Sequence, residues 1–335
     1  MDRKDFYNRL SRGALPSVLL FEGEEDYLKQ TALNDLCRAM LSPGMEDLDL
    51  ARMEDPETDA LIAAAETIPF MSVRRVVIVR DYAPLVGKQE PGDRLLKYLP
   101  TVPSTAVLVF FCTKKPDARK KLYTTIKKLD GIVNFSKLKN QELTHFVTEA
   151  FRAEGKECSD RTADALIFRC GSDTSRLLTE VAKIASHNVS SPSVDPAEIE
   201  ALTSPSAEST VFQMVDALVS GQETKAFSLM RQQLRQGENR IMMLALFLRQ
   251  FRLMQHIKIM QYEKRSPQEI KSALGVPPFA ADQYIRQAAA WKNGQVKQAV
   301  HICLDMEYAV KSGRVNSEGS LETVMIKLAA LRQKL

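Results

Sequence analysis

The sequence lacks the marks of a zinc protein, a disulfide-rich protein, a secreted protein or a membrane protein. Its five cysteines are scattered without a Cys-x-x-Cys pair, which argues against a zinc site or disulfides and favours buried thiols in a reducing cytosol. The first ten residues, MDRKDFYNRL, are charged and contain no apolar segment of the kind a signal peptide needs. No apolar run approaches the roughly 18–20 residues of a membrane-spanning helix. We therefore expect a cytoplasmic protein with no membrane partner.

Histidine is also scarce, and the arrangement of the chain's four histidines points to no catalysis. None has a carboxylate, serine or cysteine at a spacing that indicates a triad or a metal cluster. We expect no catalytic residue, no metal and no cofactor. The composition, 44% hydrophobic and 26% charged over 335 residues, is that of a globular protein of two or three domains. The net charge of +4 permits contact with nucleic acid without requiring it.

Residues 1–140 alternate between apolar runs and amphipathic stretches. Buried strands separated by helices are typical of a mostly parallel sheet covered on both faces, an α/β arrangement. The predicted strands are Val18–Phe21, Val76–Arg80, Val107–Cys112 and Ile132–Phe135. The predicted helices are Tyr27–Met40, Thr58–Glu66, Arg94–Tyr98 and Ala118–Lys128.

After residue 140 the pattern is that of an all-α protein. Helices are predicted at 141–154, 160–169 and 175–185, followed by a Ser- and Pro-rich linker at 187–210 with a short helix at 197–202. Beyond residue 210 the 3.6-residue period continues to the end of the chain. The helices predicted there are 211–220, 223–236, 240–263, 267–274, 280–291, 294–312 and 321–335.

The most informative local feature is the turn at Gly23, where an apolar run meets a helix. An NTPase carries G-x-x-x-x-G-K-[ST] at such a junction, supplying N–H groups, a lysine and a hydroxyl to phosphates and Mg²⁺. Here Glu24, Glu25 and Asp26 follow the glycine, and no Gly-Lys-Ser/Thr appears. Gly23 to Asp26 are thus predicted to be a degenerate nucleotide site, on a scaffold that does not bind ATP in the usual place.

Four segments in order resemble the delta-subunit family of bacterial DNA polymerase III, the clamp-loader subunit family. They are Leu19–Leu28, Ala65–Arg75, Phe212–Leu218 and Leu304–Gly313. The resemblance covers the chain from about Leu15 to Leu335. It implies an AAA+-like architecture: a RecA-type parallel-sheet domain at 1–140, a small helical lid domain with its linker at 141–205, and a C-terminal helical collar domain at 206–335.

The resemblance also implies a protein-binding site in the segment before the third predicted strand. Composition alone allows Phe70 and Met71 to pack into the core of the first domain. In the family, however, this segment inserts an apolar pair into the sliding clamp, and the pair falls on Pro69 and Phe70. Well-studied members place leucine where this chain has Pro69. The predicted clamp-binding residues are Ile68, Pro69, Phe70 and Met71.

The function implied is that of a clamp-loader subunit in DNA replication, which binds and opens the sliding clamp (beta). It would have no ATP hydrolysis of its own, and the polymerase activity of the holoenzyme would reside in other subunits. The partners implied are the clamp, the gamma/tau and delta-prime subunits through the collar, and primer–template DNA. Candidate phosphate contacts are Lys114, Lys115, Lys120 and Lys121, although such a run also fits a solvated helix face.

Two other classes of protein remain open on the sequence. An active AAA+ ATPase, such as a helicase loader or motor subunit, would need a nucleotide site. Asp81 follows a strand as a Walker-B acid does, and Arg176 follows Gly171-Ser172-Asp173 as a sensor arginine does. Helix capping by Ser172 or Asp173 beside a surface arginine is the simpler interpretation. An independent DNA-binding protein is the other alternative.

Overall fold

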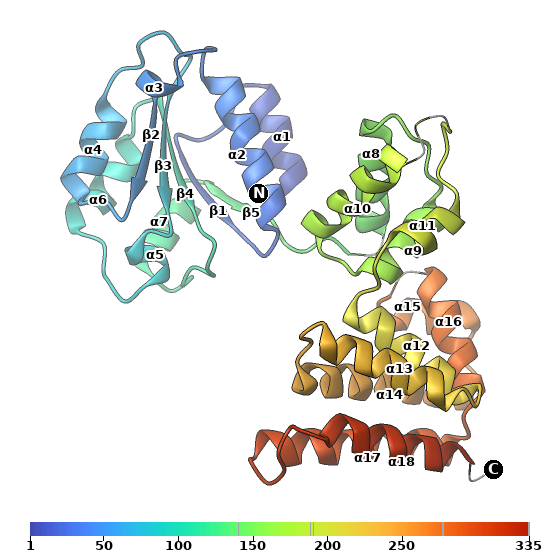
Figure 1. Ribbon diagram of the computed structural model, residues 1–335. Coiled ribbons are helices and arrows are strands. Elements are labelled where there is room, and N and C mark those ends of the chain that lie inside the picture. Colours follow the sequence, from blue (N-terminus) through green and yellow to red (C-terminus); the bar gives the residue numbers. More distant parts are fainter. Residues whose placement is uncertain (140, 188, 190, 277, 334–335) are drawn as a thin grey trace. The chain divides into compact units, whose positions relative to one another are not determined.

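The computed structural model describes residues 1–139, 141–187, 189, 191–276 and 278–333 (Figure 1). The chain divides into two compact units, Met1–Leu138 and Lys139–Leu335. The three-domain division with breaks after residues 140 and 205 stays a prediction; residue 140 itself lies outside the described part. None of the helices described combines the length and apolarity that a bilayer span requires.

The first unit is built on a five-stranded sheet in the order β2-β3-β4-β1-β5, and every neighbouring pair of strands is parallel. The predicted parallel α/β fold is therefore confirmed. The strands are β1 (Val18–Glu22), β2 (Leu50–Glu54), β3 (Arg75–Arg80), β4 (Ala106–Phe111) and β5 (Ile132–Asn134).

Helices cover both faces of this sheet (Figure 1). One face carries α1 (Arg3–Ser11) and α2 (Asp26–Met40); the other carries α4 (Thr58–Glu66), α6 (Asp93–Tyr98) and α7 (Lys121–Lys128). Successive residues of a strand point to opposite faces. Leu20 of β1 accordingly joins the cluster under α4, α6 and α7, whereas the Phe21 ring packs against Phe6 of α1 with ring centroids 5.3 Å apart.

Sequence patterns missed some short elements of this unit. These are α1, β2, α3 (Glu46–Asp49), α5 (Ala83–Val86) and a 3₁₀ turn, η1 (Leu99–Thr101). Strand β2 pairs only with β3 at the edge of the sheet, and none of its residues is buried. Its sequence therefore lacks the continuous apolar run that marks the buried strands. The helix predicted from Ala118 begins instead at Lys121.

The second unit is helical, as predicted. Its described helices are α8 (Gln141–Ala153), α9 (Asp160–Cys170), α10 (Thr174–His187), α11 (Pro196–Leu202), α12 (Ala207–Val219), α13 (Glu223–Arg235), α14 (Arg240–Tyr262), α15 (Pro267–Leu274), α16 (Pro278–Ala289), α17 (Asn293–Lys311) and α18 (Ser320–Gln333). Residues 334 and 335 of the last predicted helix lie outside the described part. Helices α12 to α18 share one apolar core, in which the single tryptophan, Trp291, is buried.

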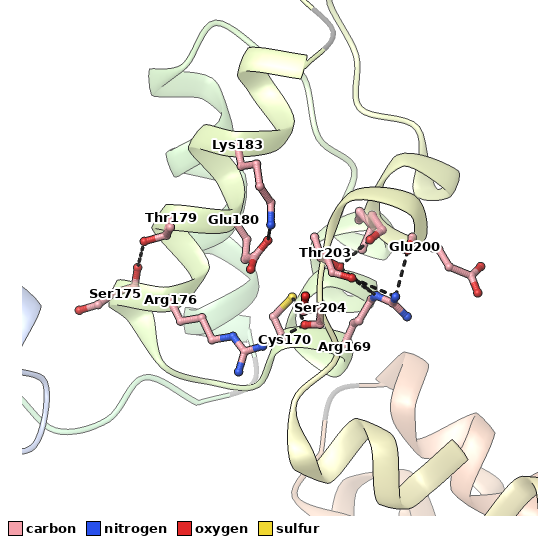
Figure 2. A network of polar contacts seen from close by, with 11 residues as sticks. Arg169, Cys170, Ser175, Arg176, Thr179, Glu180, Lys183, Glu200, Thr203 and Ser204 are labelled. Carbon is pink, nitrogen blue, oxygen red and sulfur yellow. Dashed lines mark hydrogen bonds and ion pairs between the residues drawn. The ribbon is translucent and has the colours of Figure 1, made fainter. Parts of the chain in front are cut away.

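The predicted linker at 187–210 contains α11, and residues 188 and 190 of it lie outside the described part. Hydrogen bonds from Arg169 hold the end of α11. Figure 2 shows the Arg169 guanidinium directed at the end of α11. Its Nε donates to the Thr203 hydroxyl at 2.9 Å, and its Nη2 donates to the Glu200 carbonyl at 2.9 Å. A cation at the last carbonyls of a helix also complements the helix dipole. These hydrogen bonds attach the end of α11 to α9.

Candidate functional site

The candidate residues of the first unit lie at two opposite edges of the parallel sheet. Turns that follow parallel strands gather at the carboxyl edge, and turns that precede strands gather at the amino edge. Gly23 follows β1, Asp81 follows β3 and Lys114 comes shortly after β4, which puts all three at the carboxyl edge. The segment 67–74 lies between α4 and the start of β3, at the amino edge. The predicted clamp-binding residues are thus separate from the predicted degenerate nucleotide site.

The segment 67–73 presents large apolar side chains to solvent, and we call it the apolar turn. The exposed fractions are 79% for Ile68, 70% for Phe70, 66% for Met71 and 73% for Val73. Pro69 is only half-buried. Phe70 and Met71 therefore do not pack into the core, the alternative that composition had allowed. Contiguous exposed apolar side chains are typical of surfaces that bind another molecule.

The backbone of this turn is fixed at both ends. Helix α4 ends at Glu66, and the Thr67 hydroxyl donates to the Ala63 carbonyl at 2.8 Å. On the other side, the N–H groups of Val73 and Arg74 donate to the Met40 carbonyl at 3.0 and 3.3 Å. The exposed side chains are therefore mounted on an ordered loop.

Asp49, the last residue of α3, contacts the apolar turn, and sequence reasoning missed it. Its side chain is buried beneath the apolar turn and accepts the backbone N–H groups of Phe70, Met71 and Ser72 at 2.6, 3.2 and 3.0 Å. Burial by itself raises the pKa of Asp49. These hydrogen bonds, with one from the Ser72 hydroxyl, outweigh burial and lower the pKa to about 2. No sequence pattern links an aspartate to a turn that begins some twenty residues later.

At the carboxyl edge, the carboxylates of the predicted degenerate nucleotide site interact with other groups of the chain. Glu24 pairs with Lys137 at 3.6 Å, and a Glu25 carboxylate oxygen accepts the Leu138 N–H at 3.4 Å. The Asp26 carboxylate pairs with Lys29 at 2.7 Å. Within the described ranges, no group of His, Cys, Asp or Glu side chains is arranged to hold a metal ion.

Gly23 is required by the close passage of the chain after β5. Its φ of +118° is one that residues with a side chain rarely adopt, and an added Cβ would lie 2.2 Å from the Phe135 carbonyl oxygen. The Phe135 N–H donates to the Glu22 carbonyl at 2.7 Å, and the Phe135 carbonyl accepts the Glu25 N–H at 3.1 Å. The turn therefore packs against this segment, and the Glu25 N–H donates to the chain instead of facing a ligand.

Lys29 is the second residue that the sequence-based interpretation missed. Counted from Gly23, it stands where G-x-x-x-x-G-K has its lysine, with Leu28 and Gln30 in place of the second glycine and the hydroxyl residue. A search for an intact Gly-Lys pair overlooks it. The Lys29 side chain is fully buried. Its ammonium donates to the carbonyls of Gly23 at 2.8 Å and Cys112 at 2.6 Å, besides pairing with Asp26.

An ammonium has three N–H donors, and each of these contacts uses one. The Lys29 ammonium also lies 5.5 Å from the centre of the Phe111 ring. A lysine that would face phosphate in an NTPase is thus committed to the protein's own oxygens. Lys29 therefore serves to hold the Gly23 turn and the end of β4 together.

The two residues that suggested ATPase motifs are engaged in the same way. Asp81 accepts the Thr113 N–H at 2.7 Å and the Thr113 hydroxyl at 2.6 Å. Burial raises the pKa of Asp81. The Thr113 hydrogen bonds, together with the N–H group and the charge of Lys114, outweigh burial and hold the pKa below its ordinary value. In the second unit, Arg176 donates from Nη2 to the Ser204 carbonyl at 2.9 Å (Figure 2). Its backbone N–H donates to the Asp173 carboxylate at 2.8 Å.

The four candidate DNA-contacting lysines differ in exposure and in the hydrogen bonds that their ammonium groups make. Lys114, Lys115 and Lys121 are exposed. Lys120 is half-buried, and its ammonium donates to the carbonyls of Gly87 at 2.6 Å and Gln89 at 2.9 Å. The first three side chains are therefore available to a phosphate, whereas Lys120 would have to break two hydrogen bonds.

Comparisons with known proteins match most of the chain. A family model described as "DNA polymerase III, delta subunit" matches residues 19–136, and one described as "DNA polymerase III delta subunit, C-terminal domain" matches 208–328. The curated DNA polymerase III subunit delta of Bacillus subtilis (strain 168) is 25% identical over 339 residues, 98% of each chain. The solved structure of the Bacillus subtilis DNA clamp loader delta protein superposes with a TM-score of 0.55 at 24% identity, covering 98% of this chain and 99% of that one.

Proposed function

Because the chain belongs to the DNA polymerase III delta-subunit family, we propose that it binds the sliding clamp through the apolar turn and opens it. The observation that carries the proposal is the exposure of Phe70, 70%, on a turn fixed at both ends. Aromatic side chains that fill a pocket are the usual anchors of protein interfaces. Ile68, Pro69 and Met71 would surround this anchor.

Opening needs no chemistry in this chain. A protein that binds the open ring more tightly than the closed ring shifts the equilibrium toward the open ring, by no more than that difference in affinity. ATP hydrolysis would belong to neighbouring subunits of the loader, and polymerase activity to other subunits of the holoenzyme. The engagement of Lys29, Asp81 and Arg176 by the chain's own atoms supports this division of roles. An active AAA+ ATPase is the alternative, and retention of ATP by the purified chain would favour it.

The proposed opening predicts that the chain releases clamps from DNA without ATP. Clamps loaded on circular DNA cannot slide off, so their release reports opening of the ring. The purified chain is expected to release them in the absence of nucleotide, and Phe70→Ala is expected to release them much more slowly. Release that requires ATP, or that Phe70→Ala supports at the wild-type rate, would refute the proposed mechanism.

The remaining partners are proposed on the same basis. Helices α12 to α18 would join the collar with the gamma/tau and delta-prime subunits, and the assembly would act in the cytoplasm on primer–template DNA. Lys114, Lys115 and Lys121 are the exposed cations that would contact phosphates, and Lys120 would contribute less because it is already bonded. Such contacts hold DNA without reading its sequence.

Phosphate contacts predict a specific salt dependence. Replacing both Lys114 and Lys115 with alanine should reduce the slope of log K against log salt for DNA binding by the assembled loader by roughly 2, since each phosphate contact contributes about 0.9. Lys127 and Lys128, which are exposed on the last turn of α7, provide the matched double control. An unchanged slope in the Lys114/Lys115 variant would remove these residues from the DNA interface.

A further inference from the structure

We propose that Asp49 is the positioning residue of the clamp-binding surface, and that it acts through the backbone of Phe70, Met71 and Ser72. The inference rests on the proposed function. Ile68, Phe70, Met71 and Val73 are each at least 66% exposed, although burying apolar side chains is favourable. A turn of this kind keeps its shape only if its backbone is held. The buried Asp49 carboxylate holds this backbone through hydrogen bonds from three of its N–H groups.

The contacts of Asp49 are concentrated on three successive amides. One carboxylate oxygen accepts the Phe70 N–H at 2.6 Å, and the other accepts the N–H groups of Met71 and Ser72 at 3.2 and 3.0 Å. Successive N–H groups in a turn form a concave anion site. Here the anion is a buried side chain of the same protein, so the site is filled permanently. Hydrogen bonds to a charged acceptor are also stronger than those between neutral groups.

The other contacts of the turn hold different atoms. The Ser42 hydroxyl donates to the Met71 carbonyl at 2.8 Å, and the Ser42 N–H donates to the Ser72 hydroxyl at 3.0 Å. The Met40 carbonyl accepts the amides of Val73 and Arg74. These contacts fix the second half of the turn to the end of α2. Asp49 accepts the amide N–H of Phe70 itself.

The consequence for binding is preorganisation. A turn already held in its bound conformation loses less conformational entropy when a partner binds. In Asp49→Asn, one carboxylate oxygen is replaced by an NH₂ group that faces backbone N–H donors and cannot accept from them. The Phe70 side of the turn would loosen, while Val73 and Arg74 stay attached to α2. Affinity for the clamp should fall about tenfold without any change in the contacting side chains.

The test is a double-mutant cycle in the full-length chain, with Asp47→Asn as the matched control because Asp47 is an exposed aspartate of the same short helix. We expect Asp49→Asn to weaken clamp binding about tenfold and to speed amide exchange at Phe70, Met71 and Ser72. Exchange in β3 should stay unchanged, which a general loss of stability would not allow. Since Asp49 acts through Phe70, Asp49→Asn/Phe70→Ala should bind no more weakly than Phe70→Ala alone.

Each contrary result has a distinct meaning. Additive losses in the double variant, or wild-type clamp affinity in Asp49→Asn, would overturn the positioning role. Faster exchange in Asp49→Asn together with wild-type affinity in Phe70→Ala would overturn the proposed function and leave the hold of Asp49 on the turn standing. If Asp49→Asn does not fold, exchange in the wild-type chain decides. The amides of Phe70, Met71 and Ser72 must then be strongly protected, and rapid exchange there would overturn the proposal.

Discussion

Replacing Lys29 with methionine is expected to destabilise the first unit by roughly 3 kcal/mol and to create no affinity for ATP. Methionine fills much of the same space but leaves the Gly23 and Cys112 carbonyls without the donor that now lies 2.8 and 2.6 Å away. A buried polar group left unpaired costs about 1–3 kcal/mol. Removing a buried ammonium offsets part of that cost. The Asp26 carboxylate, which is 67% exposed, can be solvated by water after it loses Lys29, so its loss of a partner should cost little.

The measurement must report on the first unit alone. The single tryptophan, Trp291, belongs to the second unit, so its fluorescence is unsuitable. Amide exchange at Leu20, whose N–H donates to the Gly131 carbonyl at 2.8 Å within the sheet, reports the free energy of opening. Lys128→Met, at an exposed lysine, is the control. Unchanged protection of Leu20 in Lys29→Met would show that this lysine is not structural, and stabilisation by ATP would show that the turn still binds nucleotide.

The strands and helices of the first unit could be predicted from the sequence, whereas the contacts of Lys29 could not. The buried strands β1, β3 and β4 and the long helices were predictable because apolar periodicity is a local property. The prediction of a degenerate nucleotide site at Gly23 rested on carboxylates that are adjacent in the chain. What Lys29 does instead depends on Cys112, at the end of a strand more than eighty residues away. No local pattern records that contact.

The apolar turn shows the same limit. Its location followed from a family resemblance, since the composition of Ile68 to Met71 fits a core segment equally well. Exposure is decided by tertiary structure, here by Asp49 beneath the turn and by Met40 beside it. Val73, which is 73% exposed, extends the apolar surface beyond the residues predicted from sequence. Leu48, 54% exposed, precedes Asp49 in α3 and is another apolar side chain that the sequence did not single out.

Phe70→Ala is expected to reduce the affinity for the sliding clamp by about 2–4 kcal/mol, or roughly thirty- to several-hundred-fold in Kd. Truncation removes the aromatic surface that would enter a pocket on the clamp. The free energy of unfolding should change little, because the ring is 70% exposed. Substitutions at exposed positions usually change stability by about 0.5 kcal/mol or less. The loss of clamp affinity in Phe70→Ala should therefore come from the lost contact and not from unfolding.

Tyr262→Ala is the matched control, since this aromatic side chain is 84% exposed on α14 in the other unit. The most direct test is a calorimetric titration of the cognate sliding clamp with the wild-type chain, Phe70→Ala and Tyr262→Ala. We predict equal, saturable binding by the wild type and Tyr262→Ala, and a loss of at least thirtyfold in affinity for Phe70→Ala. Wild-type affinity in Phe70→Ala would contradict the assignment of the apolar turn as the surface that binds the clamp.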